Sequence, residues 1–265
     1  MIHYKVLFLD IDGTTIRPDD TIEESTKLAV SKVQDQGVEV FLATGRPLHE
    51  IQSIAKALNV KSFIGYNGAY GIYKGVDLFQ ERMMADMVAN FLRISKNFDH
   101  EMVMYTNNHN AFTSLEKPTV EKFIKKFHLN KNKLFSNDVI NDVLGITLMD
   151  VKGNEYLHYL NDHRIHLTQV NVEGMENCYD VIRDNVNKGF GVNCVLKHLG
   201  IGKESSIAFG DGLNDKEMLM NVGEGFAMGN AHPDLFAYAK HKTTSVTDSG
   251  IYNGLKALGL LDYTE

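Results

Sequence analysis

The chain has 265 residues, of which 43% are hydrophobic and 23% are charged, and it carries a formal net charge of −7. This length buries a substantial core and allows one or two domains. The acidic balance argues against a nucleic-acid partner, and the absence of any apolar run near the ~20 residues that span a bilayer argues against a membrane partner. The N-terminus does not resemble a secretory signal, and two cysteines, Cys178 and Cys194, are too few for a disulfide scaffold, so we expect a cytoplasmic protein.

The first 80 residues alternate between strand and helix patterns. The apolar run Val6–Leu9 predicts a strand buried on both faces, as in a parallel sheet covered by helices. A capping box at Thr21 and Glu24 predicts a helix that ends near Gly37. After it we expect strands over 38–43 and 62–66, a helix from Pro47 to about Leu58, and a hairpin around Lys74-Gly75.

This βαβαβ order predicts a doubly wound, parallel, Rossmann-like sheet of the α/β class. From about residue 83 the pattern changes, and we expect helices over 84–98, 117–127 and 154–161 with strands over 102–106, 111–114 and 146–151. A buried strand over 205–210 then restores the first pattern. The sequence therefore predicts a core domain made of residues 1–82 and 184–265, with an α+β domain inserted at residues 83–183.

Two carboxylates, Asp10 and Asp12, follow the first strand directly. Carboxylates at the tip of a buried strand are costly unless a cation or a proton compensates them. Gly13 then frees the backbone to turn and bring amides near a ligand. A carboxylate nucleophile beside a second carboxyl that carries a proton is one chemistry that needs this arrangement. An ordinary Asp-Gly turn is the alternative for either aspartate alone.

Polar groups also follow the other strands of the predicted sheet, where ligands bind in open α/β folds. Thr44 and the amide of Gly45 stand before a helix, a favourable place for a phosphate-like anion. Asn67 precedes Gly68, and the last buried strand runs into Gly210-Asp211-Gly212-Leu213-Asn214-Asp215. Each feature alone has an ordinary explanation as a cap, a turn or a hairpin, and Lys188 as a surface lysine. Together, at successive strand ends, they favour a binding site.

The charges of this set indicate which site it is. Asp10, Asp211 and Asp215 bring three negative charges, Asp12 adds a fourth when ionised, and a phosphomonoester adds up to two more. At short range such charges repel by several kcal/mol each even at an effective dielectric constant of ~20. A hard divalent cation with oxygen ligands removes the repulsion, and Mg²⁺ suits a site that shares ligands with a substrate phosphate. Lys188 supplies a further positive charge.

With these blocks in view, the chain resembles the haloacid dehalogenase-superfamily phosphatases, and among them the Cof-type hydrolases with a large inserted cap. The similarity of plan covers nearly the whole chain, and its specific part is a set of short blocks. The matching blocks are Asp10-Ile11-Asp12-Gly13-Thr14, Ala43-Thr44-Gly45-Arg46-Pro47, Asn67-Gly68-Ala69, Lys188-Gly189, Gly210-Asp211-Gly212-Leu213-Asn214-Asp215 and Ala227-Met228-Gly229-Asn230-Ala231.

The resemblance implies a phosphoric monoester hydrolase in which Asp10 attacks phosphorus and forms an aspartyl-phosphate that water hydrolyses. Asp12 then protonates the leaving oxygen and deprotonates the water, while Thr44 and Lys188 complete the catalytic set. The implied ligands of Mg²⁺ are Asp10, the Asp12 carbonyl and Asp211, with Asp215 orienting the metal shell. The implied contacts of the phosphoryl oxygens are Gly13, Thr44, Gly45, Lys188 and Asn214.

The resemblance also implies a small phosphorylated metabolite, such as a sugar phosphate, as substrate, and a monomer or homodimer as the active form. The inserted domain is expected to close over the site and to select the leaving group. Three alternatives stay open: a metal-independent dehalogenase, a phosphotransferase that uses the same aspartyl-phosphate, and a catalytically silent protein that binds a phosphorylated ligand.

Overall fold

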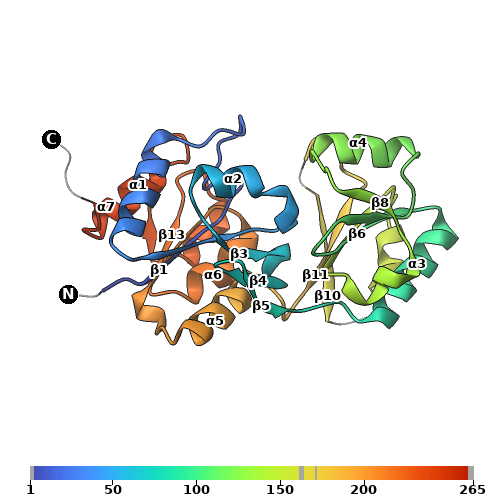
Figure 1. Ribbon diagram of the computed structural model, residues 1–265. Coiled ribbons are helices and arrows are strands. Elements are labelled where there is room, and N and C mark those ends of the chain that lie inside the picture. The colour runs from blue at the N-terminus through green and yellow to red at the C-terminus, as the bar shows by residue number, and fades with distance from the viewer. Residues whose placement is uncertain (1–2, 161–163, 171, 262–265) are drawn as a thin grey trace. The chain divides into compact units, whose positions relative to one another are not determined.

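The computed structural model describes residues 3–160, 164–170 and 172–261 (Figure 1). The chain divides into two compact units. The first, the core unit, comprises Met1–Arg46, Ile51–Phe79 and Asn187–Glu265, and the second, the inserted unit, comprises Pro47–Glu50 and Gln80–Val186. The expected inserted domain at 83–183 lies inside the second unit, which also takes ten residues that were expected in the core, at positions 47–50, 80–82 and 184–186.

An eight-stranded sheet in the order β14-β13-β12-β1-β2-β3-β4-β5 forms the middle of the core unit (Figure 1). The strands from β14 to β3 are parallel, and β4 pairs with β3 antiparallel. The bounds of the strands are β1 Val6–Leu9, β2 Glu39–Ala43, β3 Ser62–Gly65, β4 Tyr70–Tyr73, β5 Val76–Gln80, β12 Ser206–Gly210, β13 Glu224–Ala227 and β14 His241–Lys242.

Helices cover both faces of this sheet. α1 packs against α7, and α5 packs against α6 (Figure 1). Val6 and Phe8 of β1 join the apolar cluster that contains residues of α5 and α6. All four residues of β1 are buried, so its alternate residues Leu7 and Leu9 are buried on the other face. The predicted α/β fold is confirmed. The helix bounds are α1 Glu24–Asp35, α2 Gln52–Ala57, α5 Lys188–Leu199, α6 Lys216–Met220 and α7 Gly250–Ala257.

The inserted unit contains a six-stranded sheet in the order β10-β11-β9-β6-β7-β8, antiparallel except for the β7–β8 pair. Two separate apolar clusters flank it, one with residues of α3 and the other with residues of α4. The bounds are α3 Ala85–Phe98, β6 Glu101–Tyr105, β7 Asn110–Phe112, α4 Pro118–Lys126, β8 Asn132–Leu134, β9 Gly145–Met149, β10 Ile165–Gln169 and β11 Tyr179–Arg183.

Two predicted helix starts are wrong. The capping box does not form, because Thr21 makes both its backbone and its hydroxyl hydrogen bonds with Asp19, and α1 starts at Glu24 without a side-chain cap. The helix expected from Pro47 to Leu58 is a 3₁₀ turn over Leu48–Glu50, followed by the shorter α2.

A third predicted helix, over 154–161, is a 3₁₀ segment over Glu155–Tyr159, and residue 161 lies outside the described residues. The hairpin at Lys74-Gly75 is confirmed, with both residues at positive φ.

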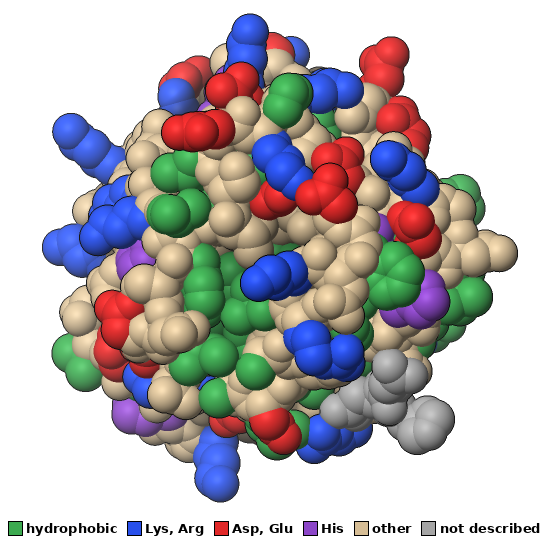
Figure 2. Space-filling model, turned by 90° about the vertical axis from the view of Figure 1, so that its right-hand side faces the viewer, with side chains coloured by type: hydrophobic (Ala, Val, Ile, Leu, Met, Phe, Trp, Pro, Cys, Tyr) green, Lys and Arg blue, Asp and Glu red, His purple; other side chains and the backbone are tan. Residues whose placement is uncertain are grey.

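On the face shown in Figure 2, basic and acidic side chains are intermixed around a group of hydrophobic side chains. This face therefore has no patch of purely positive or purely negative charge. None of the helices in the described part of the chain is long and apolar enough to cross a membrane. Cys178 and Cys194 are not in a disulfide.

Candidate active site of the core unit

The candidate site lies at the carboxyl end of β1, between β12 on one side and β2 on the other. β1 is the strand at which the order of the sheet reverses, and this switch point is where open α/β sheets bind ligands. Asp10 follows β1 and is 5% exposed. Its backbone N–H donates to Phe209 O of the neighbouring strand, and its carbonyl accepts a hydrogen bond from Thr15 Oγ1 at 2.5 Å. The position of Asp10 is therefore fixed by the sheet.

Lys188, the first residue of α5, is fully buried and bridges two carboxylates. Its Nζ donates to Asp10 Oδ1 at 2.5 Å and to Asp215 Oδ1 at 2.7 Å. Burial alone lowers the pKa of this ammonium, but the charges of Asp10 and Asp215 outweigh burial and raise it above the ordinary lysine range. Lys188 is therefore a permanent cation at the tip of β1.

The loop after β12 supplies the other carboxylates. Asp215 is fully buried, and its Oδ2 accepts hydrogen bonds from the backbone N–H groups of Asp211 and Gly212, both at 3.0 Å. Both Asp215 oxygens therefore already have protein donors. Asp211 Oδ1 accepts from Thr14 Oγ1 at 2.9 Å, and Asn230 Nδ2 donates to the Gly13 carbonyl at 2.8 Å.

Three carboxylates and one ammonium leave this cluster with an excess of negative charge. Burial, followed by the charge of Asp215, raises the pKa of Asp10 well above its usual value. The same two causes raise the pKa of Asp211 to about 6, against the hydrogen bond from Thr14 and the charge of Lys188. Raised pKa values in a carboxylate cluster indicate a deficit of positive charge.

A divalent cation fits this deficit. One oxygen from each of Asp10, Asp211 and Asp215 lies within 4.8 Å of the others. The donors are all oxygens, as hard cations require. Because Asp215 is held by Lys188 and two amides, Asp10 and Asp211 are the carboxylates best able to ligate the ion directly, and Asp215 orients its surroundings.

A second group of polar side chains lies at the ends of β2, β3 and β12. Thr44 is buried, and its Oγ1 accepts from the Arg46 N–H at 3.0 Å, which leaves the hydroxyl proton available for a ligand. The Asn67 N–H donates to the Thr44 carbonyl at 3.1 Å, and Asn214 Nδ2 donates to Asn67 Oδ1 at 3.1 Å. The structure thus joins the turn that contains Thr44 and Gly45 to Asn214 through Asn67.

Arg46 is the residue whose role the sequence reasoning missed. Its Nε donates to Asp12 Oδ2 at 2.9 Å and its Nη2 to Asp12 Oδ1 at 2.5 Å, a bidentate pair between half-exposed side chains. The Asp12 carboxylate is therefore paired with Arg46. The sequence signal was present, because Arg46 stands within the Thr44-Gly45-Arg46-Pro47 block, but nothing local connects it with an aspartate 34 residues away.

The Asp211 carboxyl should make the stability of the metal-free protein fall as the pH rises. A folded-state pKa of about 6 means that this stabilisation is complete below about pH 4 and is lost as the pH rises through 6. At about 1.4 kcal/mol per pKa unit the loss is on the order of 3 kcal/mol. Urea unfolding between pH 4 and 7 measures it, and Asp211→Asn should reduce the slope and leave only the part that Asp10 contributes. Added MgCl₂ should stabilise the wild type at pH 7 far more than at pH 4, and an equal effect at both would contradict the cation site.

Gly13→Ala should remove cation binding without unfolding the protein. Gly13 has a φ of +80°, and an added Cβ would lie 2.3 Å from Asp211 Oδ2. The methyl group must therefore displace the Asp211 carboxylate. We expect activity to fall by at least about 100-fold and the stabilisation by MgCl₂ to disappear, because the displaced carboxylate is one of those expected to ligate the cation. Gly37→Ala is the matched control, since Gly37 has a φ of +82° but open space around it.

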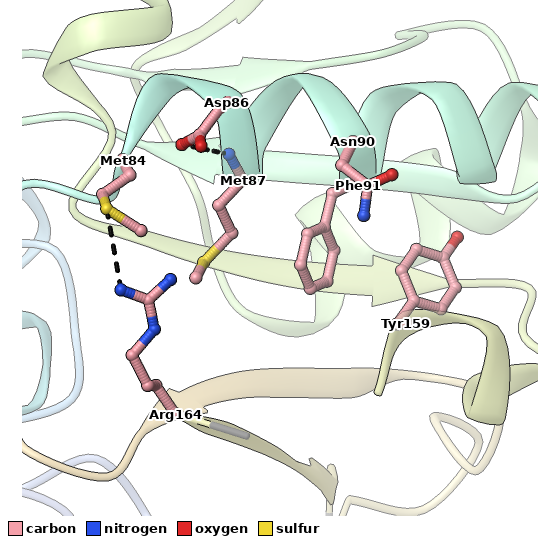
Figure 3. A pocket seen from close by; sticks show the side chains of 7 residues that line it. All are labelled: Met84, Asp86, Met87, Asn90, Phe91, Tyr159 and Arg164. Carbon is pink, nitrogen blue, oxygen red and sulfur yellow. Dashed lines mark hydrogen bonds between the residues drawn. The ribbon is translucent and has the colours of Figure 1, made fainter. Parts of the chain in front are cut away.

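A separate pocket of about 210 Å³ lies within the inserted unit (Figure 3). Arg164 Nη1 lies 3.8 Å from Met84 Sδ, and the Met87 N–H donates to Asp86 Oδ1 at 2.9 Å. Its lining contains no nucleophile beside a base. The lining residues are Met84, Asp86, Met87, Asn90, Phe91, Tyr159 and Arg164.

Comparison with known proteins agrees with this geometry. The family described as haloacid dehalogenase-like hydrolase matches residues 7–255. YkrA of Bacillus subtilis strain 168, named as a candidate phosphatase, is 30% identical over 260 residues, which cover 97% of this chain and 98% of YkrA. The HMP-PP phosphatase of Escherichia coli K12 is 26% identical over 248 residues, covering 88% of this chain and 86% of that protein.

Solved structures show the same fold. A protein of Geobacillus kaustophilus HTA426 superposes with a TM-score of 0.89 at 28% identity, covering 97% of this chain and all of that one. The subclass IIB sugar phosphatase BT4131 superposes with a TM-score of 0.82 at 24% identity, covering 97% and 100%, a likeness of fold alone. The family expected from the motifs is confirmed: the chain belongs to the haloacid dehalogenase-like hydrolases.

Proposed function

We propose that this protein is a cytoplasmic, Mg²⁺-dependent phosphatase that hydrolyses a small phosphorylated metabolite through an aspartyl-phosphate on Asp10. The observation that carries the proposal is the contact of Lys188 Nζ with Asp10 and Asp215, beside Asp211. A structural ion pair would need one carboxylate for one lysine. Three buried or half-buried carboxylates around one ammonium instead suit a site that gains a cation and a phosphate.

In the proposed reaction Asp10 is the nucleophile. Lys188 holds Asp10 Oδ1, so Oδ2 is the oxygen that attacks phosphorus. The bond from phosphorus to the leaving oxygen breaks as the bond to Asp10 forms, and Asp12 gives its proton to the leaving oxygen. Asp12 then takes a proton from water, whose oxygen bonds to phosphorus as the bond from phosphorus to Asp10 breaks, so that inorganic phosphate leaves and the Asp10 carboxylate is restored. This role requires Asp12 to give up one of its two hydrogen bonds with Arg46, while the other keeps the carboxyl in place.

The remaining residues position charge and oxygen atoms. Asp10, the Asp12 carbonyl and Asp211 would hold the Mg²⁺, which when bound neutralises the carboxylates and the phosphoryl oxygens. The Thr44 hydroxyl, the backbone amides of Gly13 and Gly45, Lys188 and Asn214 would contact the transferring phosphoryl group. Phosphoryl transfer depends mainly on such positioning and charge stabilisation.

The substrate class is supported by the relatives. One is named for HMP-PP and another for sugar phosphates, both small phosphorylated molecules. We assign the choice of leaving group to the inserted unit. None of the sequence blocks that match the family lies within residues 80–186, so this part of the chain is free to differ between enzymes with different substrates. A monomer or a homodimer would suffice, because all of the proposed catalytic residues belong to one chain.

The test is release of inorganic phosphate from a panel of phosphorylated metabolites, with MgCl₂ and with EDTA. We expect turnover of small esters, above all sugar phosphates, that EDTA abolishes. Turnover in EDTA would contradict metal dependence. Transfer of the phosphoryl group to an added sugar, detected by product analysis, would make the protein a phosphotransferase, and no turnover of any ester would leave only ligand binding.

A further inference from the structure

The segment Pro47–Glu50 belongs to the inserted unit although core residues precede and follow it. It is the 3₁₀ turn that replaces the start of the predicted helix. Leu48 is buried, and the side chains of His49 and Glu50 are only 3% and 5% exposed. A charged side chain this deeply buried requires specific partners.

Glu50 accepts three hydrogen bonds from two residues of the inserted unit. Its Oε1 accepts from the Asn130 N–H at 2.9 Å and from Asn110 Nδ2 at 3.0 Å, and its Oε2 accepts from Asn130 Nδ2 at 2.9 Å. Burial by itself raises the pKa of the Glu50 carboxyl, but the hydrogen bonds from Asn130 and Asn110 outweigh it and lower the pKa. Glu50 is therefore held as a carboxylate that ties the segment to β7 and to the loop after α4.

His49 joins the same hydrogen-bond network through Asn110, but one of its ring nitrogens is left without a partner among the described residues. Asn110 Nδ2 donates to Glu50 and to Asn132 Oδ1, so Asn110 Oδ1 accepts the proton of His49 Nε2 at 3.0 Å. This leaves His49 Nδ1 buried, without a hydrogen-bond partner among the described residues. A buried acceptor without a donor destabilises the fold, so the other contacts of the segment must outweigh this unfavourable free energy.

The anchored segment is joined directly to the candidate active site by the chain. Arg46, whose side chain donates two hydrogen bonds to Asp12, is the residue before Pro47. The Arg46 N–H donates to Thr44 Oγ1. The turn of Thr44, Gly45 and Arg46 is thus held at one end by β2 and at the other by Glu50. Only Pro47, Leu48 and His49 lie between Arg46 and the anchored Glu50, so a shift of Glu50 is transmitted to Arg46 through this short stretch of chain.

We propose that Glu50 is a positioning residue that anchors the Thr44–Arg46 turn to the inserted unit and so sets how Arg46 holds Asp12. This inference rests on the proposed function, in which Asp12 protonates the leaving oxygen. Loss of the hydrogen bonds of Glu50 should therefore lower kcat most for esters whose leaving oxygen must be protonated by Asp12. Sugar phosphates have poor leaving groups and need it, whereas 4-nitrophenyl phosphate releases a stable anion and needs it little.

The kinetic test compares Glu50→Ala with the wild type on two esters, the sugar phosphate hydrolysed fastest in the panel and 4-nitrophenyl phosphate. We expect kcat for the sugar phosphate to fall by about 10- to 100-fold, within the range that general acid catalysis contributes, and kcat for 4-nitrophenyl phosphate by less than about 3-fold. Glu50→Gln keeps one acceptor oxygen in place and should recover part of the loss.

A second measurement does not depend on activity. Hydrogen–deuterium exchange of the metal-free protein should quicken in the peptide over 44–51 in Glu50→Ala. Glu101→Ala is the matched control, because Glu101 is a buried carboxylate of the same unit, 2.7 Å from Lys117 Nζ. It should lower stability without changing exchange over 44–51 or the ratio of the two kcat values.

Equal falls for both esters, or unchanged exchange over 44–51, would overturn the inference. Where Glu50→Ala does not fold, Asn130→Ala removes the donor to Oε2 and serves in its place. Failure of the wild type to hydrolyse either ester would contradict the proposed function, whereas the exchange experiment would still decide whether Glu50 anchors the turn.

Discussion

Asp10→Asn should reduce metal-dependent phosphate release by at least about 10⁴-fold, the scale on which loss of a covalent nucleophile acts. The amide keeps the size of the carboxyl and can accept from Lys188 through its oxygen, but it cannot form the aspartyl-phosphate. Loss of the negative charge also weakens binding of the cation. Steady-state phosphate release with MgCl₂ measures the effect.

The variant must be shown to fold. Circular dichroism and thermal unfolding should give a native spectrum for Asp10→Asn, since its backbone hydrogen bonds to Phe209 and Thr15 are unaffected. Asp19→Asn is the matched control, because Asp19 contacts only exposed groups near Thr21 and Arg17. Activity of Asp10→Asn above about 1% of the wild type would exclude Asp10 as the nucleophile.

Lys188→Met should cost the metal-free protein about 3–5 kcal/mol of unfolding free energy at pH 7, and with it all activity. The substitution leaves Asp10 and Asp215 buried without their shared cation. Burial raises the pKa of the Asp10 carboxyl, so protonation of Asp10 removes an unpaired charge and the destabilisation should shrink as the pH falls toward 4. Urea unfolding at the two pH values measures the difference.

Lys240→Met is the control for loss of an exposed lysine whose carboxylate partner, Glu224, keeps a second partner in His241. The Lys240 side chain is 57% exposed and lies 2.7 Å from Glu224 Oε1, so we expect a loss of no more than about 1 kcal/mol. Stability of Lys188→Met equal to that of the wild type at pH 7 would mean that Asp10 carries no charge there, against the proposed nucleophile.

The sequence predicts those parts of the molecule whose causes are local. The apolar run Val6–Leu9 gives β1 because such residues are stable only when buried on both faces. The parallel order then brings the carboxyl ends of the strands to one edge of the sheet. This is why Asp10 meets Asp211 and Asp215, although Asp211 lies 201 residues after Asp10 in the sequence. Roles of these residues in catalysis stay predictions.

The parts that the sequence did not predict depend on distant partners. Thr21 is a good N-cap by type, yet Asp19, two residues earlier, takes its hydrogen bonds. The helix predicted at Pro47 is interrupted because Glu50 finds donors at Asn110 and Asn130, 60 and 80 residues away. The strand β10 is partly exposed and mostly polar, so its pattern is too weak to distinguish from a loop.

The chain passes from one unit to the other after residues 46, 50, 79 and 186, and this constrains how the protein can be recombined. Grafting residues 80–186 of a relative onto this scaffold would leave Glu50 facing foreign side chains in place of Asn110 and Asn130. A chimera that exchanges both pieces together, 47–50 and 80–186, preserves the buried carboxylate with its native donors. Swaps of substrate preference within this family should therefore be designed with two exchanged segments rather than one contiguous cassette.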